Sequence, residues 1–318
     1  MSKEITHNSS LGMSFIIPCY NEASNISRTL ASGIPHVPPQ NTWEILVVDN
    51  GSTDGTRALA TAAGAKVLDG SGLSLGALRN VGAANAQYDV LVFLDADISL
   101  TEDWSRAAAN DVATWVRDDS VITGSWPDVP PSASWIAKSW HPTRQKVGDV
   151  SHLGTGHLIT SRKVFGLLSG FNEELSTGED FDLCTRARRL GVRVVARPAL
   201  RVIHRGEPNS LKEFFLREMW HGIGDRENTR LSPIVAASVA HAGLHFALLA
   251  SIIILPQTGI SSVILLLSTI FFLLLVGARR KHKWRGIFSF PGCVFLTWVY
   301  LWARFLSWVG LRGRRSRV

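Results

Sequence analysis

The stretch Val90-Leu-Val-Phe-Leu-Asp-Ala-Asp97 is an apolar run that leads directly into two carboxylates separated by one residue. Such a run predicts a strand buried on both faces, as in a parallel sheet covered by helices. Two carboxylates this close raise each other's pKa unless a cation lies beside them, and their hard oxygen atoms suit Mg²⁺ or Mn²⁺. The alternative is a turn in which one Asp caps the next helix, and it accounts poorly for both acids.

Strands and helices are predicted to alternate along the chain before this run. Such alternation indicates a mostly parallel sheet flanked by helices, whose ligands bind at the carboxyl ends of the strands. We expect strands at Ser14–Pro18, Glu44–Asp49, Ala65–Leu68 and Val90–Asp95, with helices near Glu22–Ser32, Thr53–Ala63 and Leu75–Ala86.

Asp49 stands at the end of the second predicted strand, where its carboxylate could accept a hydrogen bond from a base or a ribose. The following residues 50–56 also fit a simple turn with a Thr or Asp helix cap. No GxxxxGK[ST] motif occurs, and Gly70, Gly72 and Gly76 have GxGxxxG spacing rather than GxGxxG. A phosphate group would therefore be held by a metal and basic side chains.

The charges of the 318-residue chain are unevenly distributed. All 26 Asp and Glu residues precede residue 228, whereas 11 of the 33 Lys and Arg residues follow it and flank long apolar runs. This pattern is typical of a membrane anchor at an anionic lipid surface, and we expect no nucleic-acid partner. The 46% hydrophobic content excludes a disordered chain, and three widely spaced cysteines predict no disulfide framework.

Two membrane spans are predicted at about 234–255 and 260–278, because residues 231–278 contain no Asp, Glu, Lys or Arg. Their lengths of about 33 and 28 Å match a hydrocarbon core of about 30 Å. Two core helices of a larger soluble fold are the alternative, but they would need a polar face. A third apolar segment, 287–309, contains Arg304 and several Trp residues, and we expect it to be interfacial, re-entrant or spanning.

The basic cluster at 279–285 predicts a cytoplasmic loop, and residues 1–12 show no signal-peptide pattern. We therefore expect a multi-pass protein of the cell (inner or plasma) membrane. Its parts would be a polar tail at 1–12, a cytoplasmic catalytic domain at 13–227 and a membrane region at 228–318.

Five sequence blocks, in order, carry a family resemblance between about Ser14 and Gly224. They are IIPCYNE, VVDNGSTDGT, ALRNVGAANA, FLDAD, and GTGHLITSRKVF with GFNEELSTGEDFDLCTRARRLG. In these blocks the chain resembles the family 2 glycosyltransferases, which have the GT-A nucleotide-diphospho-sugar fold. The predicted fold class is therefore α/β: a GT-A fold with a mostly parallel sheet flanked by helices, followed by C-terminal transmembrane helices.

The resemblance also implies roles for individual residues. It implies a catalytic base at Asp180 with Glu179 beside it, and metal ligands at Asp97, Asp95 and His204 for Mg²⁺ or Mn²⁺. It implies contacts to the nucleotide sugar from Pro18, Tyr20, Glu22, Asp49, Arg79, Asn80 and Asp95. Two alternatives stay open: the acids at 179–182 could stabilise the first turn of a helix and pair with Arg186, and His204 could be structural.

The reaction explains why these residue types are needed. A leaving diphosphate needs a divalent ion to neutralise its charge, and an acceptor hydroxyl needs a carboxylate to take its proton. One base and one face of attack imply inversion at the anomeric carbon. Arg217, Trp220 and His221 precede the apolar region, and we expect them to contact the diphosphate or the acceptor.

The predicted function is therefore that of a membrane-attached, metal-dependent inverting glycosyltransferase. It would transfer a sugar from a nucleotide-diphosphate sugar to a lipid-linked or glycan acceptor in cell-envelope polysaccharide or glycolipid synthesis. The alternatives are a nucleotidyltransferase of the same broad fold and a non-catalytic membrane scaffold with a degenerate transferase domain.

Overall fold

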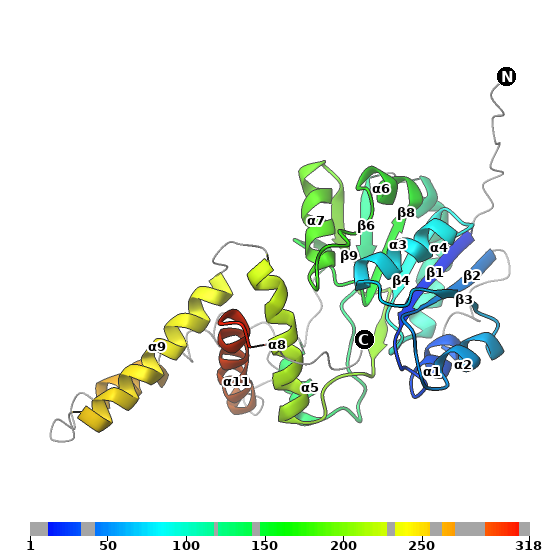
Figure 1. The fold of residues 1–318 in the computed structure, drawn as a ribbon. Coiled ribbons are helices and arrows are strands. Elements are labelled where there is room, and N and C mark those ends of the chain that lie inside the picture. The colour runs from blue at the N-terminus through cyan, green and yellow to red at the C-terminus, as the bar shows by residue number, and fades with distance from the viewer. Residues whose placement is uncertain are drawn as a thin grey trace. The chain divides into compact units, whose positions relative to one another are not determined.

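The computed structural model describes residues 12–32, 42–117, 120–141, 147–227, 233–254, 263–270 and 290–311 (Figure 1). The chain forms two compact units. The first contains Met1–Pro130 and Gln145–Gly206, and the second contains Pro131–Arg144 and Glu207–Ser316. Of the predicted polar tail at 1–12, residues 1–11 lie outside the described residues.

The first unit is built on an eight-stranded sheet with the order β3-β2-β1-β4-β8-β6-β9-β7. The strands β1 to β4 run parallel, while β8 is antiparallel to both β4 and β6. The strands are β1 (Gly12–Cys19), β2 (Thr42–Asp49), β3 (Lys66–Asp69), β4 (Val90–Leu94), β6 (Val121–Gly124), β7 (Gly148–Asp149), β8 (His157–Ser161) and β9 (Arg193–Ala196). The predicted parallel sheet is therefore confirmed for the first half of this unit, and an antiparallel strand follows it.

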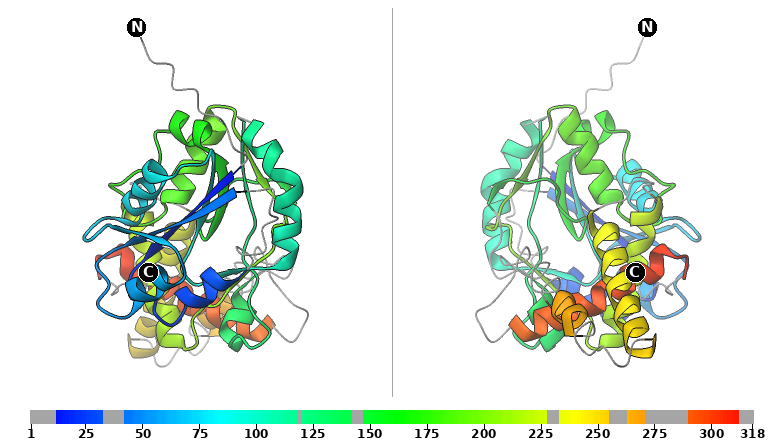
Figure 2. Two further views of the ribbon diagram at one scale, coloured as in Figure 1. Left: turned by 90° about the vertical axis from the view of Figure 1, so that its right-hand side faces the viewer. Right: turned by 90° about the vertical axis from the view of Figure 1, so that its left-hand side faces the viewer.

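Helices cover both faces of this sheet, and Figure 2 shows the strands running between them. On β1, Phe15 and Ile17 pack into one apolar core with Trp104, whereas Ile16 packs into another with Phe165. Burial on both faces explains why β1 and β4 are apolar throughout instead of alternating. The helices are α1 (Ile26–Ala31), α2 (Thr56–Ala62), α3 (Leu75–Asn85), α4 (Glu102–Arg117), α6 (Arg162–Leu167) and α7 (Glu179–Arg189).

The strand register brings the predicted site residues to one edge of the sheet. Cys19 of β1 pairs with Asp49 of β2, and Asp49 pairs with Asp69 of β3, so these strands end at the same level. A separate antiparallel pair, β5 (Ile98–Leu100) and β10 (Val202–His204), places His204 opposite Ile98, next to Asp97. Asp49 therefore lies where the parallel strands end, and the β5–β10 pair brings His204 close to Asp97.

The second unit is helical. It contains α5 (Trp135–Trp140), α8 (Leu211–Glu227), α9 (Pro233–Ile254) and α11 (Phe290–Trp308). Trp140 of α5 packs against Phe214 of α8 and Tyr300 of α11, with ring centroids 4.8 and 5.2 Å apart. An ion pair between Glu218 and Arg304 (3.0 Å) also joins α8 to α11.

The helix α9 coincides with the first predicted span. Its segment Pro233–Ala250 is long and apolar enough to cross a membrane, and it is the single such helix among the described residues. The second predicted span, 260–278, lies outside the described residues except for 263–270, which are helical. The third apolar segment forms α11. The structure thus offers one candidate span, and crossing by several helices stays a prediction.

Candidate active site

Asp49 lies at the carboxyl end of β2, and its side chain is fully buried. Its Oδ2 accepts hydrogen bonds from the Ser52 backbone N–H (3.0 Å) and from Arg57 Nη1 (3.2 Å). Its Oδ1 is buried and has no hydrogen-bond partner among the described residues. A buried carboxylate oxygen without a donor costs free energy, so this position suits a donor group supplied by a ligand.

Arg57 was not predicted from the sequence, although it directly follows the GSTDGT block. Its Nη1 lies 3.2 Å from Asp49 and 3.3 Å from Asp69, so it links the ends of β2 and β3. The Ser71 hydroxyl and Arg57 lower the pKa of the Asp69 carboxyl. The guanidinium therefore fixes the orientation of the Asp49 carboxylate.

The residues predicted at the end of β1 differ in exposure. Tyr20 is exposed, whereas Pro18 is buried within β1 and pairs with Val48. Glu22 is buried, and its Oε2 accepts a hydrogen bond from Asn25 (2.8 Å). Of these three side chains, only that of Tyr20 is open to a ligand in this conformation.

Arg79 on α3 is the cation at the centre of the site, with 1% of its side chain exposed. Its Nη2 donates to Asp95 Oδ1 (2.7 Å) and its Nη1 donates to Glu179 Oε1 (2.6 Å). Burial acts to lower the pKa of Arg79, but the two carboxylates outweigh it and raise that pKa. Arg79 thus joins β4 to the start of α7, two segments far apart in sequence.

Asn80, predicted beside the donor, uses its amide inside the protein. Its Nδ2 donates to the Phe171 carbonyl (2.9 Å) and to Glu173 Oε1 (2.8 Å), and its Oδ1 accepts from the Phe171 backbone N–H. These bonds hold the loop that precedes α7.

Asp97 and His204 form the other half of the predicted metal site. Asp97 Oδ2 lies 2.9 Å from His204 Nε2, and Asp97 Oδ1 is buried without a hydrogen-bond partner among the described residues. Asp95 is engaged by Arg79, and the described residues contain no group of three His, Cys, Asp or Glu side chains that could hold a metal. The predicted three-residue ligand set is therefore not assembled in this conformation.

The remaining pair still fits a divalent ion. Mg²⁺ commonly takes one or two protein ligands and completes its shell with water and substrate phosphates. The unpartnered Asp97 oxygen beside His204 offers such a partial ligand set.

Gly206 lies against this pair. A Cβ added at Gly206 would come within 1.8 Å of Asp97 Oδ2. Gly206→Ala is therefore expected to push Asp97 away from His204 and to raise the Mn²⁺ concentration for half-maximal activity about tenfold. Titrating Mn²⁺ into wild type and variant measures this change. Gly166→Ala is the control, because a Cβ at Gly166 meets no atom within 4 Å; equal Mn²⁺ requirements in all three proteins would refute the prediction.

Asp180 and Glu179 occupy the first turn of α7 but differ in their surroundings. Glu179 is buried and bound by Arg79 and by the Thr155 hydroxyl (3.2 Å). Asp180 accepts hydrogen bonds from the backbone N–H groups of Thr155 (3.3 Å) and Phe181 (2.7 Å). Burial and the neighbouring Glu179 raise the pKa of Asp180 to about 7. A carboxylate with this pKa is suited to take a proton near neutral pH.

The alternative role of the acids at 179–182, pairing with Arg186 on the same helix, is observed for Asp182. Asp182 pairs with Arg186 at 2.7 Å across one helical turn, as expected for a structural pair. Glu179 instead binds Arg79 and the Thr155 hydroxyl, and Asp180 accepts hydrogen bonds from two backbone N–H groups.

Two glycines keep the space beside the carboxylates open. A Cβ at Gly154 would lie 3.5 Å from Asp180 Oδ2, and one at Gly156 would lie 3.2 Å from Asp95 Oδ2. The segment Gly154-Thr155-Gly156 thus lies along both acids, and sequence reasoning had given these residues no role.

Arg217, Trp220 and His221 belong to α8 in the second unit. Arg217 pairs with Glu207 (2.6 Å) and lies 3.7 Å from Glu218, so its charge is balanced within this unit. The rings of Trp220 and His221 are in contact, with centroids 4.8 Å apart. Their predicted contacts with substrate stay predictions.

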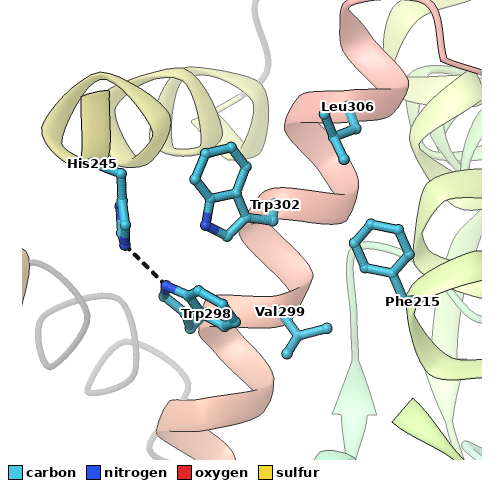
Figure 3. A pocket seen from close by; sticks show the side chains of 6 residues that line it. All are labelled: Phe215, His245, Trp298, Val299, Trp302 and Leu306. Carbon is cyan, nitrogen blue, oxygen red and sulfur yellow. Dashed lines mark hydrogen bonds between the residues drawn. The ribbon is translucent and has the colours of Figure 1, made fainter. Parts of the chain in front are cut away.

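A cavity of about 330 Å³ in the second unit is lined by side chains of α8, α9 and α11 (Figure 3). Trp298 Nε1 donates a hydrogen bond to His245 Nε2 (3.0 Å) at its edge. None of the site carboxylates lines this cavity. Its lining residues are Phe215, His245, Trp298, Val299, Trp302 and Leu306.

Comparison with known proteins identifies related sequences. Residues 14–160 match the family described as Glycosyl transferase family 2. The succinoglycan biosynthesis protein ExoA of Rhizobium meliloti is 28% identical over 208 residues, which cover 61% of this chain and 62% of that protein. The glycosyltransferase AglE of Haloferax volcanii is 33% identical over 107 residues, which cover 32% of this chain and 35% of that protein. The chain thus spans less than two thirds of the length of either relative.

Solved structures share the fold. The mannosyltransferase PcManGT from Pyrobaculum calidifontis, in complex with GDP-Man and Mn²⁺, has a TM-score of 0.59 at 17% identity, over 94% of this chain and 87% of that one. GalNAc-T7, with UDP, GalNAc and Mn²⁺, has a TM-score of 0.52 at 20% identity, over 72% of this chain and 54% of that one. These likenesses confirm a GT-A-like α/β fold.

Proposed function

We infer that this chain, whose residues 14–160 match the glycosyl transferase family 2 domain, is a glycosyltransferase that uses a nucleotide-diphosphate sugar. The observation that carries the proposal is the double ion pair of Arg79. By binding both Asp95 and Glu179, it brings the end of β4 and the start of α7 together. The neighbours of these two acids, Asp97 and Asp180, then serve as candidate metal ligand and candidate base at one edge of the sheet.

The proposed reaction is a direct displacement at the anomeric carbon. The acceptor oxygen forms a bond to that carbon while the bond to the diphosphate oxygen breaks, and the electron pair leaves with the nucleoside diphosphate. Asp180 takes the proton of the acceptor hydroxyl. Because a single base acts on one face, the product has the inverted configuration.

A divalent ion has a defined place in this proposal. When bound, Mg²⁺ or Mn²⁺ supplies positive charge to the leaving diphosphate. Asp97 and His204 would hold it, since their contact leaves one Asp97 oxygen available. Asp49 would accept a hydrogen bond from the nucleotide, because its Oδ1 lacks a donor among the described residues.

We further propose that the chain acts at a membrane. The candidate span in α9 supports attachment, and the basic, acid-free region after residue 228 supports contact with an anionic lipid surface. A lipid-linked or glycan acceptor in cell-envelope polysaccharide or glycolipid synthesis is consistent with such a location. The relative named for succinoglycan biosynthesis supports glycan assembly as the setting.

The proposal is tested with a panel of UDP-, GDP- and dTDP-sugars in the presence of Mn²⁺, scored for nucleoside diphosphate release. We expect release from one donor by the wild type, its loss with EDTA, and a decrease of about a hundredfold in Asp97→Ala. Asp103→Ala is the control, because Asp103 is an exposed residue paired only at the surface with Arg106. Release of sugar 1-phosphate instead of nucleoside diphosphate would indicate nucleotidyl transfer and refute the proposal.

A further inference from the structure

The helix α11 packs on α5 and α8 from its first turn to its last. A Cβ added at Gly292, in the first turn, would lie 3.0 Å from a serine hydroxyl of α5. Farther along, Arg304 pairs with Glu218 of α8 (3.0 Å). In the last turn, the side chain of Ser307 lies against Gly222 of α8. Wherever α11 lies relative to a membrane, α8 therefore lies beside it.

The charges of α8 are incompatible with the hydrocarbon layer. Charged side chains are costly at that depth and are rare in membrane-spanning segments. Seven of the 17 residues of α8 are charged, namely Lys212, Glu213, Arg217, Glu218, Asp225, Arg226 and Glu227. Among the described residues, only α9 is long and apolar enough to cross a membrane, and α11 does not meet that criterion. An α11 that crossed the bilayer would carry α8 into it.

One face of α11 nevertheless exposes large apolar side chains. Phe295 is 42% exposed and Trp298 is 36% exposed, and their rings stack with centroids 6.1 Å apart. Val309 continues the helical hydrogen bonding after α11 and is also exposed. Because successive helix residues are turned by about 100°, these three side chains lie within about 60° of one another around the axis. Aromatic and aliphatic side chains on one face are typical of a helix in the headgroup region.

Basic residues flank α11 on both sides in the sequence. The segment 279–285 contains five Lys and Arg residues, the segment 312–317 contains four Arg residues, and no Asp or Glu lies between 228 and 318. A crossing helix would place the two clusters on opposite sides of the membrane, although Lys and Arg favour the anionic cytoplasmic leaflet. A helix in the plane of the surface lets both clusters contact one leaflet.

The neighbouring α9 shares only part of its length with the rest of the helical unit. Its buried residues are Val235, Ser238, His241 and Ala242, and none of residues 243–250 is buried. Its second half extends away from α11 (Figure 1). Two helices that cross a membrane side by side would share contacts along their lengths. A helix that enters the bilayer beside one that lies on its surface shares them over a part.

We propose that α11 is an interfacial helix that lies in the plane of the membrane, with the face formed by Phe295, Trp298 and Val309 against the headgroups of an anionic leaflet. The opposite side of α11 then holds α5 and α8, and the basic segments 279–285 and 312–317 contact the same leaflet. This inference rests on the proposed membrane attachment and assigns its docking surface.

The depth of nitroxide labels tests this placement. The full-length chain is reconstituted into vesicles of equal parts phosphatidylcholine and phosphatidylglycerol, and Phe295→Cys and Val309→Cys are labelled singly. The two positions are fourteen residues, or about 21 Å, apart along the helix. Depth is measured from relaxation by oxygen and by a water-soluble nickel complex. We expect both labels at the headgroup level, within about 5 Å of each other. Cys19, Cys184 and Cys293 are buried, so the wild type measures background labelling.

A matched pair on α9 is the control. Ile234 and Leu249 are exposed and lie fifteen residues, or about 22 Å, apart. Labels at Ile234→Cys and Leu249→Cys are expected to differ in depth by more than about 10 Å, because α9 is the candidate span. The inference is overturned if the two α11 labels differ in depth by about 20 Å, if both lie near the bilayer midplane, or if both stay as open to the nickel complex as without vesicles. Failure of the wild type to float with the vesicles would refute the proposed attachment, and this inference with it.

Discussion

Replacing Asp180 by asparagine is expected to slow sugar transfer to a hydroxyl acceptor about a thousandfold, because the amide cannot take the acceptor's proton. The amide keeps the size of the carboxylate and can still accept the N–H of Thr155 or Phe181. The measurement is kcat for transfer at pH 8 with saturating donor and Mn²⁺. Asp182→Asn is the control on the same helical turn, since Asp182 pairs with Arg186. A phosphate acceptor arrives already ionised, so a variant with near-wild-type transfer would indicate that class of acceptor.

The pH dependence gives an independent check of the same residue. Since the pKa of Asp180 is raised to about 7, the base form is the minor species below neutrality. The kcat/KM for transfer is therefore expected to rise about tenfold per pH unit up to pH 7 and then to level off. An ordinary Asp ionises near pH 4, so between about pH 4 and 7 the unfolded chain has lost the proton that folded Asp180 still holds, and the stability of the folded state falls as pH rises. Asp180→Asn should consequently melt no lower than the wild type at pH 8, and a profile that is flat from pH 5 to 8 would contradict this assignment.

Replacing Arg79 by methionine is expected to lower the free energy of unfolding by about 3–5 kcal/mol. The substitution leaves Glu179 buried without its cation and removes the partner of Asp95. Urea denaturation followed by circular dichroism measures the loss, and transfer activity should fall with it because the two segments of the site separate.

The matched control is Arg106→Met. Arg106 is 74% exposed, and its ion pair with Asp103 lies at the surface, so the expected loss is under about 1 kcal/mol. A loss of similar size in both variants would show that the Arg79 pairs contribute no more than a surface ion pair.

The sequence was sufficient to predict the parts of the site that lie at strand ends. The run from Val90 to Asp97 placed a strand and its two acids correctly, because burial on both faces leaves an uninterrupted apolar signal. The antiparallel β8 was not predicted, since a short apolar strand carries no mark of its direction. The site between Asp97 and His204 was anticipated from the resemblance, and the structure brings that pair together.

The connections between distant segments could not be predicted from residue patterns. Arg79 binds Glu179 across 100 positions of sequence, and nothing in the local pattern of either residue identifies its partner. Arg57 looked like an ordinary residue of a helical first turn, and its link between Asp49 and Asp69 depends on the register of β2 and β3. Gly154 and Gly156 lack side chains that would lie against Asp180 and Asp95, and the sequence alone does not show this proximity.

The helical unit is assembled from two separate stretches of chain, and this constrains any attempt to cut the protein in two. Its α5 comes from residues 131–144, inside the chain that forms the sheet, whereas α8 and α11 follow residue 206. Ile136 and Trp140 of α5 pack on side chains of those later helices. A fragment ending at Gly206 would keep α5 but lose α8 and α11, whose side chains pack on it. Its apolar side chains would then be exposed to water, so a soluble fragment must also replace the 131–144 segment.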